Sequence, residues 1–310
     1  MSLRTRGPSR DWGRSAPSAH PGGGAVLVTG ASSGIGLAVV TLLRTAGHDV
    51  VLASRSAEAL ERAVDVSEGE GAALPVVADV SSAAEVRDLF DRAAEWATGR
   101  GRALTGVVHC PAVLAYGRVE DVPDEVLDHA LAVSLGGAVN VARTALRHWS
   151  GRDEVGSLVV VGSLLGEVTV PGMGAYATAK WGVHGLVRTL QQENRGRAAR
   201  ARVSLVVPGG VDTPVYEQAG TYLGRHGSPP PPVVSPHRVA RAAVRCLERP
   251  RRRVSVGPAN SLTRLGFLLV PPVYDLLVGP LARALALGRR ADDGPGNVLA
   301  PVPEKERLRG

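Results

Sequence analysis

The sequence predicts an α/β fold: one doubly wound parallel β-sheet flanked by helices. Short apolar runs alternate along the chain with stretches of helical periodicity, and this alternation is the pattern of successive βαβ units. Aliphatic residues dominate the hydrophobic 44% of the chain, whereas aromatic residues make up 4%. Such a composition suits strands that are buried on both faces.

Six apolar runs are expected to form strands, and a further strand is expected near the end of the alternation. They are Ala25–Thr29, Val50–Ala53, Leu74–Ala78, Gly106–His109, Ser157–Val161 and Val203–Val207, followed by Arg253–Gly257. Helices are expected at residues 35–46, 57–67, 82–98, 124–149, 174–195 and 236–248. Residues 214–235 are rich in proline and glycine, so we expect a loop there.

The ends of the chain differ from this alternating body. Residues 1–24 and 291–310 lack periodicity, and we expect a disordered leader and a disordered tail on either side of a catalytic domain over 25–257. Residues 258–290 are expected to form an apolar helical extension. Its apolar part, 261–288, lacks an unbroken run of about 20 apolar residues, so we do not expect it to span a membrane. Two interpretations stay open: packing on the body or across an oligomer interface, or contact with a membrane surface or hydrophobic substrate.

Charge and cysteine content exclude some classes of function. The net charge is +7, but residues 1–24 contribute +3 and Arg251–Arg253 contribute another +3. The remaining body is close to neutral, so we expect no nucleic-acid partner. Cys110 and Cys246 have no metal-ligand spacing, so we expect no metal site. A single disulfide is one alternative, but free thiols in a reducing cytoplasm are the favoured interpretation.

A glycine-rich segment follows the first apolar run. It contains glycines at three positions and polar or aliphatic residues between them, namely Gly30, Ser32, Ser33, Gly34, Ile35 and Gly36. These glycines permit a tight turn and a close approach of the backbone to a pyrophosphate, and the next helix starts here with free N–H groups. Because the segment lies between a strand and a helix, it predicts a Rossmann-type dinucleotide site.

A tyrosine and a lysine four residues apart form the second motif. Lys180 is one of two lysines in the chain, and Tyr176 lies one helical turn before it. Residues i and i+4 share a helix face. A cation beside a phenol lowers the phenol pKa from about 10, which would make Tyr176 an acid/base near neutral pH.

Four motifs in this order resemble the short-chain dehydrogenase/reductase family over residues 24–257. Thr-Gly-x-x-x-Gly-x-Gly at 29–36 resembles its cofactor loop, and Ser163, thirteen residues before Tyr176, matches its catalytic serine. The resemblance implies that Ser163 orients the reacting oxygen, and that Lys180 holds the nicotinamide ribose. It also assigns cofactor contacts to a segment resembling Pro-Gly-x-Val-x-Thr, formed by Pro208, Gly209, Val211 and Thr213.

The residues after the second and third strands favour NADP(H) over NAD(H). Ser54 stands where an acidic residue would bind a ribose 2′-hydroxyl, and Arg55 follows it. A guanidinium can bind a 2′-phosphate through two hydrogen bonds. Asp79 and Val80 resemble the adenine-contacting segment of the family, although Asp79 would also suit a helix cap or turn.

Two segments depart from the family pattern. His109-Cys110-Pro111-Ala112 replaces the usual Asn-Asn-Ala-Gly, and Ser134 replaces an asparagine that holds a water linking the lysine to solvent. Serine can also bind water, with shorter reach and fewer hydrogen bonds. We therefore expect Ser134 to support a slower proton relay, and we expect His109 to be packed or solvated beside the cofactor rather than catalytic.

These observations predict an NADP(H)-dependent ketoreductase that interconverts a carbonyl and a secondary alcohol, on a lipophilic substrate. The alternatives are a catalytically impaired NADP(H)-binding sensor or scaffold, and another reaction on the same fold, such as epimerisation. The resemblance further implies a homodimer or homotetramer, and we expect a cytoplasmic protein.

Overall fold

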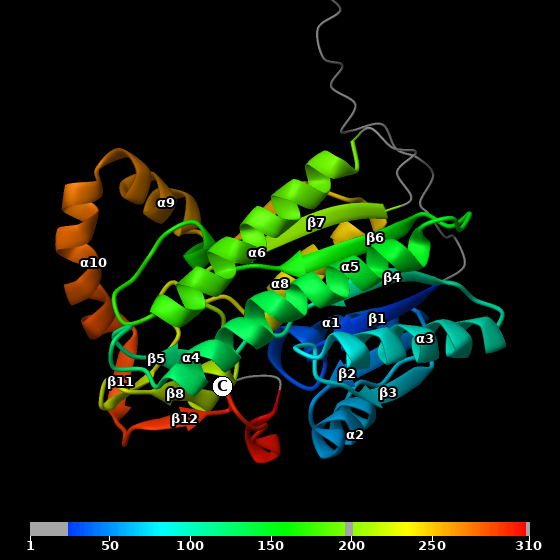
Figure 1. The fold of residues 1–310 in the computed structure, drawn as a ribbon, viewed down its shortest axis with the longest axis horizontal. Helices are drawn as coiled ribbons and strands as arrows, with labels where there is room; N and C mark the ends of the chain where they lie inside the picture. The colour runs from blue at the N-terminus through cyan, green and yellow to red at the C-terminus, as the bar shows by residue number, and fades with distance from the viewer. Residues whose placement is uncertain (1–23, 196–200, 308–310) are drawn as a thin grey trace, which may run out of the picture.

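The computed structural model describes residues 24–195 and 201–307, so almost all of the expected leader lies outside the described residues. A sheet of seven parallel strands forms its centre, in the order β10-β7-β6-β4-β1-β2-β3 (Figure 1). The strands are β1 (Ala25–Thr29), β2 (Val50–Ser54), β3 (Ala73–Val77), β4 (Leu104–His109), β6 (Gly156–Val161), β7 (Ala201–Pro208) and β10 (Arg253–Val256). The predicted α/β class and parallel sheet are confirmed.

Helices cover both faces of this sheet and enclose two aliphatic cores (Figure 1). One core lies under α3 (Ala83–Gly99), α5 (Gly137–Trp149) and α6 (Gly174–Glu193). The other lies under α1 (Gly34–Thr45), α2 (Ala57–Val66) and α8 (Pro236–Glu248). β1, β4 and β6 are buried along their whole length, which explains their unbroken apolar sequences.

The strand order creates a crevice at the carboxyl edge of the sheet. The chain proceeds from β1 outward to β2 and β3, and then returns to place β4 on the other side of β1. Loops that leave β1 and β4 therefore diverge in opposite directions. In open α/β sheets, ligands bind at this switch point.

The expected helix over 124–149 is divided in three. It consists of α4 (Asp124–Leu131), a π-helical turn η1 (Ala132–Gly136) and α5. Single π turns within α-helices are frequent at functional sites. Ser134 lies within this turn.

The expected loop over 214–235 contains regular structure. It includes α7 (Val215–Gln218), β8 (Ala219–Thr221) and β9 (Arg225–Gly227). β8 pairs with β5 (Ala115–Tyr116) and with a strand near the C-terminus, β12 (Gly294–Gly296). β9 pairs with β11 (Leu287–Arg290). Both strands of this segment pair with distant parts of the chain, so the local composition of residues 214–235 did not reveal the strands.

The apolar extension forms a helical hairpin, α9 (Asn260–Leu269) and α10 (Pro271–Leu285), that projects from one end of the molecule (Figure 1). Tyr274 Oη donates to the Thr169 carbonyl (2.9 Å), and the Phe267 ring lies between the rings of Tyr274 and Trp181. The hairpin thus packs on the body through one side. Within the described residues, no helix combines the length and apolarity needed to cross a membrane.

Residues 291–307 differ from the disordered tail that we expected. They include β12 and a short 3-10 helix, η3 (Pro303–Lys305), and the Val298 side chain is fully buried in the core under α3, α5 and α6. The order comes from hydrogen bonds to distant segments, which leave no periodicity in the tail itself. Residues 308–310 lie outside the described residues.

Candidate active site

A cavity of about 710 Å³ opens at the carboxyl edge of the sheet, where the crevice was expected. Most of the predicted site residues line it, and they come from segments far apart in the sequence. They are Gly30, Ser32, Ser33, Gly34, Ile35, Gly36, Ser54, Arg55, Val80, Ser163, Tyr176, Pro208, Gly209, Val211 and Thr213. Asp79, Ser134 and Lys180 are not part of its lining.

The glycine loop has the geometry of a phosphate-binding turn. Gly30 and Gly34 have φ values of 67° and 50°, a region that disfavours other residues. A Cβ on Gly36 would lie 1.9 Å from the Gly30 carbonyl oxygen, so only glycine allows α1 to pack on this turn. Ser33 caps α1 without a side-chain hydrogen bond, which leaves N–H groups of the first turn for another acceptor. These features fit a dinucleotide pyrophosphate.

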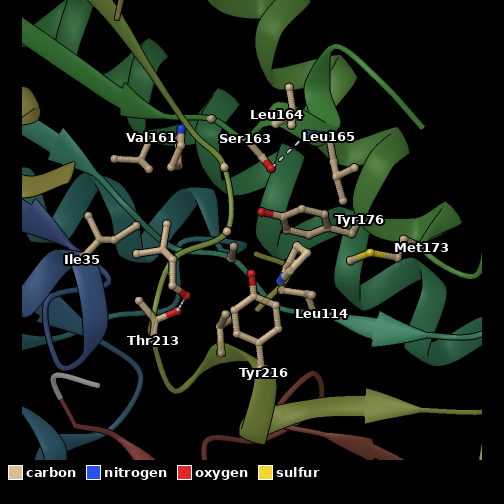
Figure 2. A pocket seen from close by; sticks show the side chains of 18 of the residues that line it. Ile35, Leu114, Val161, Ser163, Leu164, Leu165, Met173, Tyr176, Thr213 and Tyr216 are labelled. Atoms are coloured by element: carbon tan, nitrogen blue, oxygen red, sulfur yellow. Dashed lines mark hydrogen bonds between the residues drawn. The ribbon is translucent and has the colours of Figure 1, made fainter. Parts of the chain in front are cut away.

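The hydroxyl groups of Ser163 and Tyr176 lie next to each other in the wall of the cavity (Figure 2). Ser163 follows β6, and its Oγ accepts a hydrogen bond from the Leu165 N–H (3.1 Å). Tyr176 lies in the first turn of α6; burial raises its pKa, and the neighbouring Ser163 hydroxyl opposes part of that rise. The strand end and the helix start together hold the two hydroxyl groups in one place.

Lys180 lies one helical turn beyond Tyr176 and is 2% exposed. Its Nζ donates to the Val161 carbonyl at the end of β6 (3.2 Å) and lies 5.6 Å from the centroid of the Tyr176 ring. Burial lowers the pKa of Lys180 to about 8. The ammonium therefore stands behind the phenol, against the sheet.

The expected effect of Lys180 on Tyr176 does not appear in this arrangement. Burial raises the pKa of Tyr176, and the opposing influence comes from the Ser163 hydrogen bond. The physical reason is desolvation: the phenol is removed from water, while the ammonium approaches the ring and not the oxygen. The expectation of a lowered phenol pKa is therefore wrong.

His109 and Cys110, the first departure from the family, lie beside Lys180 at the end of β4. The His109 Nδ1 hydrogen-bonds with Thr29 Oγ1 (2.9 Å), and burial, then the Lys180 charge, lower the His109 pKa to about 3. A neutral imidazole is thus packed against β1. Burial also raises the pKa of the Cys110 thiol to about 12.

Ser134 and Asp79 have local partners in the structure. Ser134 is 1% exposed and its Oγ accepts from the Val113 N–H (3.4 Å). Asp79 Oδ1 accepts from both the backbone N–H and the hydroxyl of Ser81 (2.8 Å each). Asp79 therefore organises the turn before α3, as in the alternative that we had considered for it.

Arg55 reaches the cavity from the end of β2, next to Ser54. Its two terminal nitrogens donate to main-chain carbonyls of the C-terminal segment, Nη2 to Asn297 (2.7 Å) and Nη1 to Val298 (3.1 Å). The Arg55 guanidinium, which the sequence assigns to a 2′-phosphate, thus donates to carbonyl groups of the chain itself.

The Thr213 side chain packs against the glycine loop at Gly34. It lies so close to Gly34 that a Cβ there would be 3.1 Å from Thr213 Cγ2. Pro208 and Gly209, at the end of β7, bring this segment to the cavity. The motif after β7 and the glycine loop after β1, far apart in sequence, therefore form adjoining walls.

Sequence reasoning missed a polar network behind Ser163. The Ser163 N–H donates to His184 Nε2 (3.5 Å), and Glu167 lies 4.0 Å from His184 Nδ1. Arg253 binds both oxygens of Glu167 (2.6 Å each). No motif marks these residues in the sequence.

Tyr216 and the helical hairpin were also missed as parts of the site. The Tyr216 hydroxyl points into the cavity toward Tyr176 (Figure 2), although Tyr216 lies in the segment expected to be a loop. The hairpin contributes a largely apolar wall: Ala259, Leu262, Thr263, Gly266, Val270, Val273, Tyr274, Leu277, Val278, Leu281, Ala282 and Leu285. Among the described residues that line the cavity, charged side chains occur at Arg55 and Glu306, both on its glycine-loop side.

Comparisons with known proteins agree with this geometry. A family model described as short chain dehydrogenase matches residues 24–222. The uncharacterized oxidoreductase YxnA of Bacillus subtilis is 33% identical over 256 residues, covering 82% of this chain and 70% of that protein. A 3-ketodihydrosphingosine reductase of Neurospora crassa is 29% identical over 282 residues, covering 83% of this chain and 76% of that protein. The structure of an alcohol dehydrogenase from Thermococcus sibiricus, complexed with 5-hydroxy-NADP, superimposes with a TM-score of 0.62 at 26% identity, covering 75% of this chain and 95% of that one.

Proposed function

The chain belongs to the short-chain dehydrogenase family, an oxidoreductase family that acts on CH–OH and carbonyl groups with NAD(P). From this premise we propose that it is an NADP(H)-dependent enzyme that interconverts a lipophilic ketone and the corresponding secondary alcohol. The observation that carries the proposal is the placement of the Ser163 and Tyr176 hydroxyl groups side by side in the same cavity as the glycine loop (Figure 2).

The chain's own residues would hold the cofactor in three places. The glycine loop and the start of α1 would bind the pyrophosphate, Arg55 the 2′-phosphate, and Lys180 the nicotinamide ribose. The absence of an acidic side chain at Ser54 supports NADP(H) over NAD(H). When bound, the cofactor supplies or accepts a hydride.

Tyr176 would exchange a proton with the substrate oxygen, and the Ser163 hydroxyl would hydrogen-bond to that oxygen and orient it. Lys180, with a pKa of about 8, carries its charge through most of the neutral range and would bind ribose hydroxyls beside the phenol. The buried Ser134 would contribute to a proton relay from Lys180, as proposed from the sequence. His184 would position Ser163 from behind.

The substrate side of the cavity supports a lipophilic substrate. Its wall between Leu164 and α10 is formed mainly by aliphatic and aromatic groups, and the charged lining lies on the other side, near the glycine loop. A charged substrate group there would lose hydration without gaining a partner. One relative named above is a 3-ketodihydrosphingosine reductase, whose name describes a ketone on an aliphatic chain.

A membrane surface is the proposed source of this substrate. Most of the large apolar side chains exposed in the described residues lie on the hairpin: Leu262, Leu265, Leu268, Leu269, Val270, Val273, Leu276, Leu277, Leu281 and Leu285. Six of these side chains also line the open cavity, whereas Leu265, Leu268, Leu269 and Leu276 face solvent without lining it. The exposed Arg283, Arg289 and Arg290 lie at the end of this hairpin and in β11, and would complement anionic headgroups.

Flotation with vesicles of phosphatidylcholine, with and without phosphatidylglycerol, tests the membrane contact. We expect binding that Leu269→Glu or Leu276→Glu abolishes. Val66→Glu is the matched control, because Val66 is 63% exposed on α2, away from the hairpin. Absence of binding, or equal loss in the control, contradicts the contact. A smaller solution mass for Leu269→Glu would instead assign the face to contact between copies.

Turnover tests the proposed chemistry. Purified protein is incubated with NADPH or NADH and a series of ketones of increasing chain length, and cofactor absorbance is followed. We expect NADPH oxidation whose kcat/KM rises with aliphatic chain length. Preference for NADH, or for short charged ketones, contradicts the cofactor or substrate assignment respectively.

A second candidate is an impaired NADP(H)-binding sensor or scaffold. It is favoured by the raised pKa of Tyr176 and by the hydrogen bond that Lys180 Nζ donates to Val161. NADPH binding without turnover on any substrate in either direction would support this candidate over the enzyme.

Assembly and location complete the proposal. We propose a homodimer or homotetramer, as family resemblance implies, and a cytoplasmic protein that contacts membranes peripherally. The free state of Cys110 and Cys246 supports a reducing compartment. Sedimentation analysis and cell fractionation test these two points.

A further inference from the structure

The last described segment, residues 294–307, runs from β12 to η3 beside α2 (Figure 1), and we call it the C-terminal strap. Its Asn297 and Glu306 line the cavity. It begins as β12, passes Arg55 at the end of β2, forms η3, and reaches the glycine loop at Glu306 and Arg307. Its path therefore connects the two regions to which the proposed function assigns the phosphates of NADP(H).

The strap accepts hydrogen bonds from donors in both regions. At the end of β2, the Asn297 and Val298 carbonyls accept from the two terminal nitrogens of Arg55 (2.7 and 3.1 Å). The guanidinium assigned to the 2′-phosphate is thereby directed to main-chain oxygens.

At the glycine loop, the strap supplies a carboxylate and a carbonyl. The Ser32 hydroxyl donates to Glu306 Oε2, and the Gly34 N–H, at the start of α1, donates to the Arg307 carbonyl (2.9 Å). These are the positions where the loop would meet a pyrophosphate. Glu306 is partly buried there, and its bond to Ser32 places a carboxylate beside the proposed phosphate site.

The strap is attached on its other side to the segment that carries Tyr216. Gln218 Nε2 donates to the Lys305 carbonyl (2.9 Å), and Arg307 forms an ion pair with Glu217 (2.6 Å). Asn297 Nδ2 donates to Gln218 Oε1 (2.8 Å). Movement of the strap would therefore break hydrogen bonds to α7, which lies at the edge of the substrate cavity.

We propose that the C-terminal strap is an internal competitor of the cofactor, and that NADP(H) displaces residues 301–307 to bind. The inference rests on the proposed function. While residues 306 and 307 lie at the glycine loop, the Ser32 hydroxyl and the Gly34 N–H donate to them and not to a phosphate, and the Glu306 carboxylate repels phosphate charge. The Asn297 and Val298 carbonyls that bind Arg55 lie outside the displaced residues. A site that is open only part of the time has an apparent affinity reduced by the open fraction.

Titration of the full chain with NADPH, compared with a chain that ends at Ala300, tests this proposal. The shorter chain retains β12 and the buried Val298, so the core contacts stay intact. We expect its Kd for NADPH to be lower by about tenfold, the change for an open fraction near one tenth.

A single substitution provides an independent measurement should the shorter chain fold poorly. Glu306→Gln keeps the shape but removes the negative charge, and we expect tighter NADPH binding by about threefold, part of the truncation effect. Glu304→Gln is the matched control, because Glu304 is an exposed glutamate of the same strap that does not line the cavity. We expect the control to bind NADPH as the unaltered chain does.

Hydrogen exchange gives the direction of movement. With saturating NADPH, amides of residues 304–307 should exchange faster in the full chain. Weaker binding by the shorter chain, or slower exchange with cofactor, would make the strap a part of the binding site and overturn the proposal. Equal affinities for both chains and for Glu306→Gln would also overturn it while leaving the proposed function intact. Absence of NADPH and NADH binding in both chains would overturn the proposed function and this inference together.

Discussion

The Lys180 ammonium lies 5.6 Å from the centroid of the Tyr176 ring, while its hydrogen bond goes to the Val161 carbonyl (3.2 Å). The pair thus makes a cation–π contact, and the ammonium is held by the end of β6. The structure therefore ties the chain's one buried lysine to the sheet as well as to the phenol.

The burial of Lys180 predicts a stability that depends on pH. Its pKa falls from 10.5 to about 8 on folding, so below pH 8 the folded chain must keep a buried charge, and this cost is relieved as pH rises from 8 toward 10.5. Wild type should gain up to about 3 kcal/mol relative to Lys180→Met over this range. Urea unfolding of both proteins between pH 6.5 and 10.5 measures the difference.

Thr178→Met is the control for this pH series. Thr178 is exposed on the same helix, so its replacement should change the free energy of unfolding by a constant amount at every pH. If the Lys180→Met difference is equally constant, the buried-lysine interpretation is wrong.

Removal of the Tyr176 hydroxyl should abolish catalysis and spare binding. For Tyr176→Phe we expect kcat to fall by about 100- to 10,000-fold, the usual contribution of a positioned acid/base, with NADPH affinity nearly unchanged. Ser163→Ala should lower kcat/KM in the same direction, because it removes the partner of the phenol. Tyr222→Phe, at a tyrosine that does not line the cavity, should retain activity. Steady-state kinetics and cofactor titration separate the two effects, and full activity in Tyr176→Phe would refute the mechanism.

Arg55→Ala should change cofactor preference. Loss of the guanidinium should raise the KM for NADPH by about tenfold or more, because a charged hydrogen bond to phosphate contributes about 1.5–3 kcal/mol, and should leave the KM for NADH nearly unchanged. Arg87→Ala is the control, because Arg87 is exposed on α3 and does not line the cavity. Equal effects of Arg55→Ala on both cofactors would contradict the assignment of Arg55 to the 2′-phosphate.

Replacement by alanine should have opposite effects on stability at Gly36 and at Gly185. In Gly36→Ala the new methyl group would lie 1.9 Å from the Gly30 carbonyl oxygen, so we expect a loss of about 1–3 kcal/mol of stability and loss of cofactor binding. Gly185 lies on the exposed side of α6, where a methyl group meets nothing within 4 Å, so Gly185→Ala should stabilise by about 0.5–1 kcal/mol. Thermal unfolding and NADPH titration measure both changes. Normal cofactor binding by Gly36→Ala would show that the turn can move.

The fold was largely accessible from the sequence because its signals are local. The aliphatic strand β1, the glycines that follow it and the amphipathic α1 are contiguous, so periodicity and spacing reveal them. The π turn at Ser134 and the strands within 214–235 were not accessible. The partners of these strands lie elsewhere in the chain, and no local pattern specifies such pairing. The π turn is hydrogen-bonded locally, but hydrophobic periodicity does not distinguish one π turn from the α-helix around it.

The sequence by itself determined the α/β class and the family resemblance, and it predicted Ser163, Tyr176 and Lys180 as site residues. Tertiary structure alone decided what surrounds them: that burial raises the Tyr176 pKa, that an apolar hairpin forms one wall of the cavity, and that Glu306 reaches Ser32. The physical reason is that motifs record the spacing of neighbours along the chain. Desolvation and hydrogen bonding depend instead on which distant segments the fold brings together.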